Sequence, residues 1–376
     1  MTGLAPFRFA LRTEVRFGPG ALDDLPDVLE ALGARRALVV TDEGLVRAGA
    51  VEALAARLRG RVGHVVYDAV RPNPAASVID AGERVRRDEA CDVVVGFGGG
   101  SSIDTAKGIG ILATSGGAIA DYAGRDTVTV APAPVVAVPT TAGTGAEVST
   151  AIAVTDDVRQ SKFAVRAALV PPLVAILDPD TLRSVPRTVA AHTGVDTLCH
   201  CIEAYVSRGA SPLTDLLALE GVRRCARSLL PFVADRGDAA AGGDMLYAAM
   251  LGGIVISHAR TGAAHTLTRP IGDKVPHGLA NAIVLPHVMA YNLPADPPKF
   301  ADVARALDRP ADPQEAVEVV RELIATLELP TRLRDAGIDE ADLAPLADAA
   351  YELEISGLNP RELGREDIER LLREAY

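Results

Sequence analysis

The sequence predicts an α/β domain over residues 1–184, followed by an all-helical domain over residues 185–376. In the first part, short runs rich in β-branched residues alternate with amphipathic helical stretches, which is typical of βαβ units and a largely parallel sheet. After Ser184-Val185-Pro186 the β-rich runs stop and helical periodicity continues. Ser184 as a cap and Pro186 in the first turn predict that a helix begins there.

In the first domain, the elements follow from apolar runs separated by turn residues. The predicted strands are Arg36–Thr41, Val62–Tyr67, Asp92–Phe97, Val135–Val138 and Val174–Leu177. The helices predicted between the first four strands are Val46–Leu58, Ala76–Arg87 and Ser101–Thr114. The segment Ala151–Arg166 predicts a β-hairpin with Asp156-Asp157 at its turn.

The second domain is predicted to be helical throughout. Its predicted helices are Arg187–Tyr205, Leu213–Ala234, Met245–Ser257, Pro298–Leu307, Pro313–Leu327, Glu340–Tyr351 and Arg365–Glu374. The sequence contains no internal repeat and no low-complexity linker between the two halves. We therefore expect the two domains to share a tight cleft.

Composition excludes several classes of function. Hydrophobic residues make up 48% and charged residues 23%, which is ordinary globular usage. A net charge of −12 argues against a nucleic-acid binder, and 4% aromatic residues with no Trp argue against base stacking. The four cysteines form no CxxC pair, and the sequence has neither a signal peptide nor ~18 consecutive apolar residues. We expect a cytoplasmic protein without a membrane partner.

Two glycine-containing loops follow predicted strands. The first, within Val93–Lys107, reads VVVGFGGGSSIDTAK, in which glycines and a helix N-terminus can approach a phosphate closely. It matches neither the GxGxxG fingerprint nor the P-loop pattern. The second, Pro139–Glu147, reads PTTAGTGAE and adds threonine hydroxyls. A tight turn that uses glycine for steric reasons alone is the alternative, but two such loops in one sheet favour a phosphate site.

Asp42 directly follows the predicted strand Arg36–Thr41 and has two interpretations. Its carboxylate could accept hydrogen bonds from both hydroxyls of an adenosine ribose, and it would repel a 2′-phosphate. It could equally be an ordinary helix cap, and the sequence alone does not choose between these roles.

Four residues of the second domain form a candidate metal set. Asp196 and His200 stand at positions i and i+4, so both project from one face of a helix. The segment Gly262–His277 adds His265 and His277. One carboxylate and three imidazoles suit Fe(II) or Zn(II) and suit Ca²⁺ or Mg²⁺ poorly. A single histidine would be weak evidence, but the set predicts a metal site.

Three further residues lie near this set in the sequence. Cys199 and Cys201 flank His200 and are expected to point to other faces and pack in the core. His258 lies seven residues before His265, which is two helical turns. It either lines the same cleft or is a structural residue, and we favour the cleft.

Four motifs resemble one known family. They are Gly98–Lys107 (GGGSSIDTAK), Pro139–Val148 (PTTAGTGAEV), Gly194–Ser207 (GVDTLCHCIEAYVS) and Pro276–Val288 (PHGLANAIVLPHV). With these motifs, the chain resembles the iron-containing (group III) metal-dependent alcohol dehydrogenases over essentially its full length. The resemblance implies a Rossmann-like N-terminal domain and an all-helical C-terminal domain, a dehydroquinate synthase-like architecture, with the active site in the cleft between them.

The resemblance also implies site residues, position by position. The implied metal ligands are Asp196, His200, His265 and His277. The implied pyrophosphate loop is Gly99, Gly100, Ser101 and Ser102. The other implied dinucleotide contacts are Asp42, Asn73, Thr140, Thr141, Thr144 and Lys162. The expected cofactors are NAD, in preference to NADP, and one divalent metal, Fe(II) in preference to Zn(II). Relatives of this kind are commonly homodimers or larger homo-oligomers.

One position departs from the family pattern. Four residues after His265 the family usually has a second histidine, whereas this chain has Arg269. Arginine cannot act as a general acid near neutral pH, but it can hold an anion. We expect Arg269, with Lys274 or Arg260, to select a small aldehyde bearing an anionic group, such as phosphonoacetaldehyde, sulfoacetaldehyde or a semialdehyde. The alternative is that Arg269 pairs with Asp273 or with a cofactor phosphate.

The implied activity is reversible hydride transfer between NAD(H) and a small aldehyde or alcohol, with the metal as Lewis acid. The proton donor is open between His258, a metal-bound water and the nicotinamide ribose, and Arg269 is the other candidate catalytic residue. A glycerol dehydrogenase-like or dehydroquinate synthase-like enzyme is an alternative. A non-catalytic nucleotide or metal sensor is another.

Overall fold

The computed structural model describes residues 6–159, 161–272, 274–353 and 358–376, and these form two compact units. The α/β unit comprises residues 10–141 and 145–185. The helical unit comprises residues 186–376, to which the short segment Ala142–Thr144 and the described residues up to Phe9 also belong. Each unit has its own core and is described by itself.

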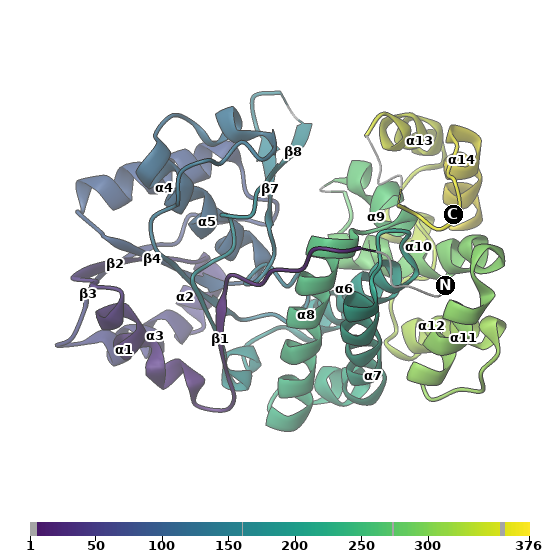
Figure 1. Cartoon of the computed structure of the whole chain (residues 1–376), viewed down its shortest axis with the longest axis horizontal. Helices are drawn as coiled ribbons and strands as arrows, with labels where there is room; N and C mark the ends of the chain where they lie inside the picture. The colour runs from purple at the N-terminus through teal and green to yellow at the C-terminus, as the bar shows by residue number, and fades with distance from the viewer. Residues whose placement is uncertain (1–5, 160, 273, 354–357) are drawn as a thin grey trace. The chain divides into compact units, whose positions relative to one another are not determined.

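The α/β unit contains a six-stranded parallel sheet in the order β1-β9-β6-β4-β2-β3 (Figure 1). The strands are β1 (Glu14–Phe17), β2 (Arg36–Val40), β3 (Gly63–Tyr67), β4 (Val93–Gly98), β6 (Val135–Pro139) and β9 (Val174–Leu177). All five predicted strands are confirmed. Strand β1 was not predicted, because it is short, contains charged residues and lies at an edge of the sheet. Its residues are exposed or half-buried, so the sequence shows no apolar run there.

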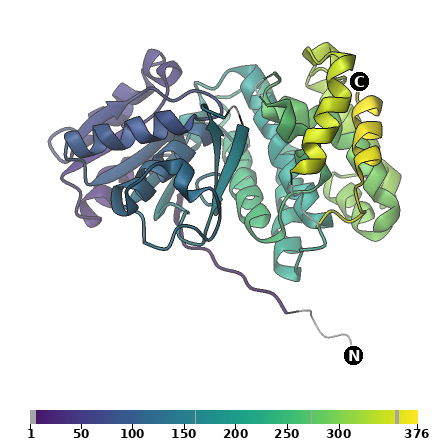
Figure 2. The ribbon, with the colours of Figure 1, turned by 90° about the horizontal axis from the view of Figure 1, so that it is seen from above.

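Helices cover both faces of this sheet (Figures 1 and 2). They are α1 (Leu25–Ala31), α2 (Glu43–Arg47), α3 (Ala50–Leu58), α4 (Ala76–Asp88) and α5 (Gly100–Ser115). Successive strand residues point to opposite faces, so Val39 packs with α1 and α3 whereas Leu38 packs with α4 and α5. The single helix predicted over Val46–Leu58 is divided, because Gly49 adopts a left-handed conformation with φ 74° between α2 and α3.

A second, three-stranded sheet contains the predicted hairpin. Strands β7 (Ala151–Asp156) and β8 (Ser161–Arg166) pair antiparallel, and the short β5 (Gly124–Arg125) pairs with β8. The register pairs Asp156 with Ser161, so Asp156 is the last residue of β7 and the turn begins one residue later than predicted. Single-turn 3-10 helices complete the unit: η1 (Ala21–Asp24), η2 (Ile119–Tyr122) and η3 (Pro179–Leu182).

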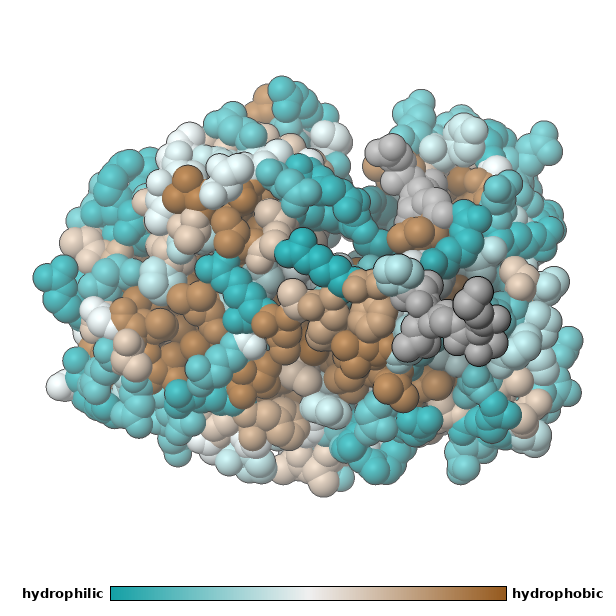
Figure 3. Space-filling model, in the orientation of Figure 1, coloured by the Kyte–Doolittle hydropathy of each residue, from teal (hydrophilic) through white to brown (hydrophobic). Residues whose placement is uncertain are grey.

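The surface around the edge strand β1 is partly apolar. Phe17, at the end of the strand, is 47% exposed, and Leu11, just before the strand, is 45% exposed. Figure 3 shows brown, apolar residues reaching the surface between the more extensive hydrophilic areas. An edge strand also leaves one row of backbone hydrogen-bonding groups without a strand neighbour.

The helical unit consists of nine named α-helices in the described residues (Figure 1). They are α6 (Arg187–Val206), α7 (Pro212–Ala234), α8 (Ala239–Ala259), α9 (Ala263–Thr268), α10 (His277–Asn292), α11 (Pro297–Ala306), α12 (Pro313–Thr326), α13 (Leu343–Glu352) and α14 (Arg365–Glu374). Short 3-10 turns are η4 (Arg269–Ile271), η5 (Leu293–Ala295), η6 (Arg334–Ala336) and η7 (Glu340–Asp342).

The seven helices predicted for this unit are confirmed, with the last but one beginning as η7 and continuing as α13. Helices α9 and α10 were not assigned from the sequence. Helix α10 is buried on nearly all sides and contains Pro286, so it lacks the polar face that reveals an amphipathic helix. The predicted roles of Ser184 as cap and Pro186 in the first turn are wrong, because Pro186 is itself the N-cap residue of α6, which begins at Arg187.

Helix α8 is long and apolar enough to cross a membrane by length and composition, with a mean hydropathy of 1.5 over its best window. However, 72% of that window is buried, and the helix packs against α6 and α7. Its composition is that of a core helix, which must be apolar on every side.

A buried ionic network links α5 to the segment that follows β6. The Lys107 side chain is completely buried, and its ammonium group has four oxygen partners. These are Asp104 Oδ1 at 3.2 Å, Ala146 O at 2.9 Å, Ser149 Oγ at 3.2 Å and Ala151 O at 2.7 Å. A buried ammonium is tolerated only when it is paired and hydrogen-bonded in this way. The network therefore holds the segment between β6 and β7 against the helix that follows the glycine loop.

Replacement of Lys107 by methionine tests this network. Lys107→Met keeps the side-chain length but leaves Asp104 buried without a cation, and we expect it to lower the free energy of unfolding by about 3–5 kcal/mol. Lys274→Met is the control, because Lys274 makes an exposed ion pair with Asp342 and should cost at most about 1 kcal/mol. Denaturant unfolding of both variants gives the comparison, and equal losses would show that the buried network is not stabilising.

Candidate active site

The four predicted metal ligands lie together in the helical unit. Asp196 and His200 are one turn apart on α6, His265 lies in the middle of α9, and His277 is the first residue of α10. The buried faces of α6 and α9 leave Asp196, His200 and His265 at most 8% exposed, whereas the His277 side chain is 44% exposed. The sequence prediction that these residues are neighbours is therefore supported by their positions.

Asp196 Oδ1 is the common centre of the cluster. The Nε2 atoms of His200, His265 and His277 lie 3.9, 3.7 and 3.9 Å from it. Ligands bound about 2.1 Å from one tetrahedral ion would be about 3.4 Å apart. The donor atoms of Asp196, His265 and His277 all lie within 4.8 Å of one another, and His200 contacts the group through Asp196. The three mutually close donors could hold one first-row divalent metal, and His200 would have to move closer to them to become the fourth ligand.

The charges of the cluster support the same conclusion. Burial opposes ionisation of Asp196, but the nearby histidines and a hydrogen bond from Asn281 outweigh it and lower the pKa of the carboxyl. Burial and the positive potential of His200 hold the pKa of His265 well below its ordinary value. The set is therefore a carboxylate with a neutral imidazole beside it, which is the protonation state that metal binding requires.

Two residues outside the predicted set contact the ligands. Glu203 Oε2 lies 2.7 Å from His265 Nδ1. Asn281 Nδ2 donates to Asp196 Oδ1 at 2.7 Å and lies 3.3 Å from His265 Nε2 and 3.2 Å from His277 Nε2. Neither residue was singled out from the sequence. Helical spacing was the available signal, since Glu203 follows Asp196 by two turns and Asn281 follows His277 by one.

Asn281 is held in one orientation. Its Oδ1 accepts a hydrogen bond from Thr268 Oγ1 at 2.7 Å, so its amide hydrogens must face Asp196. Burial raises the pKa of Glu203 to about 7, against the opposing effect of backbone N–H donors at Gly262 and Ala264. Both side chains are fully enclosed between α6, α9 and α10.

The two cysteines beside His200 differ in their surroundings. Cys201 packs in the core against Gly221, as predicted. Cys199 is also buried, but its Sγ lies 3.8 Å from His265 Nδ1, so it does not simply face away from the site. Burial raises the pKa of the Cys199 thiol well above its ordinary value. Cys199, Glu203 and His265 have donor atoms within 4.8 Å of one another, so the thiol lies beside the predicted ligand set.

The first glycine loop joins β4 to α5 in the α/β unit. Gly98 has φ 156°, and a Cβ there would lie 2.4 Å from Ser102 Oγ, so only glycine fits. Thr140 N donates to Gly98 O at 3.0 Å, and a Cβ on Gly99 would lie 3.3 Å from Thr141 Oγ1. The structure thus brings the first glycine loop beside Thr140 and Thr141 of the second.

The start of α5 has the features of an anion site. Gly99 is its N-cap residue, and Gly100, Ser101 and Ser102 form its first turn. Ser102 N donates to Gly99 O at 3.0 Å, whereas the N–H groups at the very start of a helix have no acceptor within the helix. Helix α5 is 16 residues long, so its dipole favours negative charge at this end. Placement of a pyrophosphate there stays a prediction.

The other predicted cofactor residues do not all belong to the same unit. Asp42 caps α2, accepting from Leu45 N at 3.1 Å, so the capping role is real and a ribose contact would be additional. Lys162 Nζ donates to Asn73 Oδ1 at 2.9 Å, which brings together two predicted residues far apart in the chain. Thr144 instead belongs to the segment Ala142–Thr144 of the helical unit.

The two predicted catalytic residues are also in the helical unit. His258 lies near the end of α8, where its Nδ1 is 2.8 Å from Ile254 O and its ring stacks on Phe9 at 4.2 Å between centroids. Arg269 follows α9 directly and more than a third of it is exposed to solvent. Its surroundings still lower its pKa by desolvation, and its charge contributes to lowering the pKa of His265.

The residues predicted to act with Arg269 differ in their surroundings. Lys274 Nζ forms an ion pair with Asp342 Oδ2 at 2.7 Å, so its charge is already neutralised. Arg260 ends α8 with φ 70° and ψ 171°, a conformation that residues other than glycine rarely adopt. Asp273, the alternative partner, lies outside the described residues.

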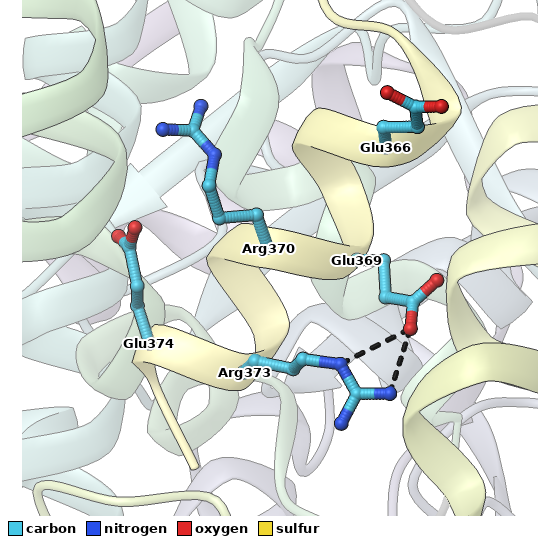
Figure 4. A pocket seen from close by; sticks show the side chains of 5 residues that line it. All are labelled: Glu366, Glu369, Arg370, Arg373 and Glu374. Atoms are coloured by element: carbon cyan, nitrogen blue, oxygen red, sulfur yellow. Dashed lines mark hydrogen bonds and ion pairs between the residues drawn. The ribbon is translucent and has the colours of Figure 1, made fainter.

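A shallow hollow on the surface has no relation to these residues. It has a volume of about 430 Å³ and is lined by charged side chains of α14 (Figure 4). Arg373 pairs with Glu369 at 2.7 Å, and Arg370 pairs with Asp367 at 2.8 Å. These charges satisfy one another along one exposed helix, so the hollow is not a candidate active site.

Comparison with known proteins agrees with the site geometry. The family model described as iron-containing alcohol dehydrogenase matches residues 12–179, and the C-terminal model of the Fe-containing alcohol dehydrogenase family matches residues 190–376. The chain belongs to the iron-containing alcohol dehydrogenase family. It is therefore an oxidoreductase that acts on CH–OH groups, and the resemblance inferred from its motifs is confirmed.

Known proteins match this chain over almost its full length. The chain is 38% identical to a 1,3-propanediol dehydrogenase of Citrobacter freundii over 96% of both chains. A crystal structure of 1,3-propanediol oxidoreductase matches with a TM-score of 0.96 and 36% identity, covering 99% of this chain and 100% of the other. A sulfoacetaldehyde reductase from Bifidobacterium kashiwanohense, solved with NAD⁺, matches at a TM-score of 0.90 and 27% identity over 99% of each chain.

Removal of the exposed ligand separates metal binding from folding. Because the His277 side chain is 44% exposed, we expect His277→Ala to change the unfolding free energy of the metal-free protein by less than about 1 kcal/mol. Its affinity for Zn(II), measured by competition with a chelator, should fall more than about 100-fold. His64→Ala, on β3, is the control and should leave the affinity unchanged. Equal affinity in the His277 variant would remove this residue from the metal site.

Proposed function

We propose that this alcohol dehydrogenase uses Fe(II) and NAD(H) to interconvert a small aldehyde bearing an anionic group and the corresponding primary alcohol. In the direction of reduction, the aldehyde, NADH and one proton give the alcohol and NAD⁺. The observation that carries the choice of substrate is Arg269, a cation near the ligand His265 at a position where the family usually has histidine. The requirement for a metal is supported by the short distances between the donor atoms of Asp196, His265 and His277, with His200 beside Asp196.

Fe(II) is proposed, with Zn(II) as the alternative, because the donors are one carboxylate and three imidazoles without a thiolate. When bound, the metal supplies Lewis acidity that polarises the substrate carbonyl. Asp196, His200, His265 and His277 would hold it. The remaining chemistry is positioning of the two reactants and delivery of the proton by groups of this chain.

We propose residues 1–184 as the dinucleotide-binding domain and residues 185–376 as the metal-binding domain. The first turn of α5 would bind the pyrophosphate, and Asp42 would accept from the adenosine ribose while repelling a 2′-phosphate. The hydrogen-bonded pair Asn73 and Lys162 would contact the dinucleotide together with the threonines of the second loop. The location of the active site between the domains stays a prediction.

Arg269 would bind the anionic end of the substrate. A guanidinium presents parallel N–H donors that match carboxylate, phosphonate and sulfonate oxygens. Arg260 is the second candidate, because strained backbone conformations such as its φ of 70° are concentrated at functional sites. Lys274 would not bind the anion, because Asp342 already neutralises its charge. The similarity to a reductase of sulfoacetaldehyde supports an anionic aldehyde as substrate.

His258 is proposed as the proton donor. Its Nδ1 lies 2.8 Å from Ile254 O, and Nε2 would be the nitrogen that transfers a proton. Its ring also stacks on that of Phe9, a contact that would help to orient the imidazole. A bound water or the nicotinamide ribose hydroxyl would take this role if His258 does not.

A homodimer or larger homo-oligomer in the cytoplasm is also proposed. Strand β1 lies at the sheet edge and exposes Phe17, so pairing with a second copy would cover both apolar surface and backbone groups. The four cysteines are free and buried, as in proteins of a reducing compartment.

Turnover tests the proposed reaction directly. Purified protein loaded anaerobically with Fe(II) or with Zn(II) should oxidise NADH when small aldehydes are added, as followed by nicotinamide absorbance. Protein stripped with a chelator should lose this activity and regain it with metal. Binding of NADH without turnover on any aldehyde would favour a sensor, and product formation without net NADH consumption would favour a synthase-like reaction.

Arg269→Ala tests the choice of substrate. Because a hydrogen-bonded charge contact contributes about 1.5–3 kcal/mol, kcat/KM for succinic semialdehyde should fall about 10- to 100-fold. For uncharged butyraldehyde it should change less than about threefold, since no anion is lost. Lys274→Ala is the control and should behave as the unmodified enzyme with both substrates. Equal losses on the two aldehydes would contradict selection by Arg269.

A further inference from the structure

The buried side chain of Glu203 has three polar partners. Its side chain lies on α6 and is almost completely buried. Oε2 accepts from Gly262 N at 2.9 Å and lies 2.7 Å from His265 Nδ1, and Oε1 accepts from Ala264 N at 2.6 Å. Two backbone N–H donors and one imidazole nitrogen, from α9 and the residue before it, therefore converge on one side chain.

The contact with His265 determines which ring nitrogen is available. When Glu203 is ionised its oxygens can only accept hydrogen bonds, so Nδ1 then faces the carboxylate as an N–H. In a neutral imidazole, Nε2 then carries the lone pair, and this atom is the one that lies 3.7 Å from Asp196 Oδ1. By contrast, His200 Nδ1 is buried without a hydrogen-bond partner in the described part of the chain.

The surrounding backbone is built closely around this carboxylate. A Cβ on Gly262 would lie 3.0 Å from Glu203 Oε1 and 3.0 Å from Asn359 Oδ1. Asn359 Oδ1 accepts from Ala263 N at 3.1 Å, so it caps α9 without contacting a ligand histidine. Glu203 and Asn359 thus share the capping of α9, but Glu203 alone of the two also contacts His265.

We infer that Glu203 is a positioning residue for the metal: it fixes the tautomer and ring orientation of His265 so that Nε2 is presented to the ion. A carboxylate partner also raises the basicity of a ligand imidazole. This inference rests on the proposed metal site. It gives Glu203 a role that capping of α9 does not require, because a cap would stabilise the helix whatever the protonation of His265.

Glu203→Gln separates the two roles. The carboxamide has the same size, but it carries one acceptor oxygen and an NH₂ group that cannot accept from Nδ1–H or from a backbone N–H. We expect affinity for Zn(II) and Co(II), measured by chelator competition, to fall about 10- to 100-fold. The visible absorption of the Co(II) protein should also change, because the ligand ring is displaced.

Asn359→Ala is the matched control, since it removes a cap from the same helix. It should lower the unfolding temperature while leaving the metal affinity and the Co(II) spectrum unchanged. A double variant tests whether Glu203 acts through His265. In protein that already carries His265→Ala, adding Glu203→Gln should not weaken metal binding further. Additive losses in the double variant would contradict action through His265.

A measurement on the unmodified Zn(II)-loaded protein covers the case in which Glu203→Gln does not fold. Nitrogen-15 NMR of His265 should show a protonated Nδ1 and a metal-bound Nε2. Metal coordination through Nδ1, or native-like metal affinity in Glu203→Gln, would overturn the inference and leave Glu203 as a cap of α9. Failure of the unmodified protein to bind any metal would instead overturn the proposed metal site itself.

Discussion

The buried carboxylate of Asp196 is the constraint on which the rest of the site depends. An ionised carboxylate removed from water is costly unless opposite charge or hydrogen bonds compensate it. Here three imidazole Nε2 atoms lie within 3.9 Å of Oδ1, and Asn281 donates to the same atom at 2.7 Å. A divalent cation would complete this compensation. Helices α6, α9 and α10 are therefore organised around a negative centre that is best stabilised by metal.

Glycines and caps make this arrangement possible. Gly278 follows His277 directly, and a Cβ there would lie 2.3 Å from the carbonyl oxygen of His192, so α10 can approach α6 only with glycine at this position. Glu203 and Asn359 satisfy the first N–H groups of the short helix α9. In the α/β unit, the paired loops after β4 and β6 are held in a comparable way by buried Lys107.

The sequence predicts the parts of this architecture whose signal is local. Apolar runs revealed five parallel strands, and the spacing of Asp196 and His200 placed two ligands on one helix face. Edge strand β1 and the uniformly buried α10 lack such periodicity, so they could not be predicted. Glu203 and Asn281 could not be assigned either, because their roles arise from contacts between helices. Glu203 contacts a residue 62 positions away in the chain, and Asn281 contacts one 85 positions away.

The central claim is that Asp196, His200, His265 and His277 bind one divalent metal. The most direct test is anomalous diffraction from a crystal of the Fe(II)- or Zn(II)-loaded protein, collected on both sides of the absorption edge of the metal. One anomalous peak should lie about 2.0–2.3 Å from Asp196 Oδ1 and from the three Nε2 atoms. A peak elsewhere, or none in protein shown to contain metal, would contradict this account of the site.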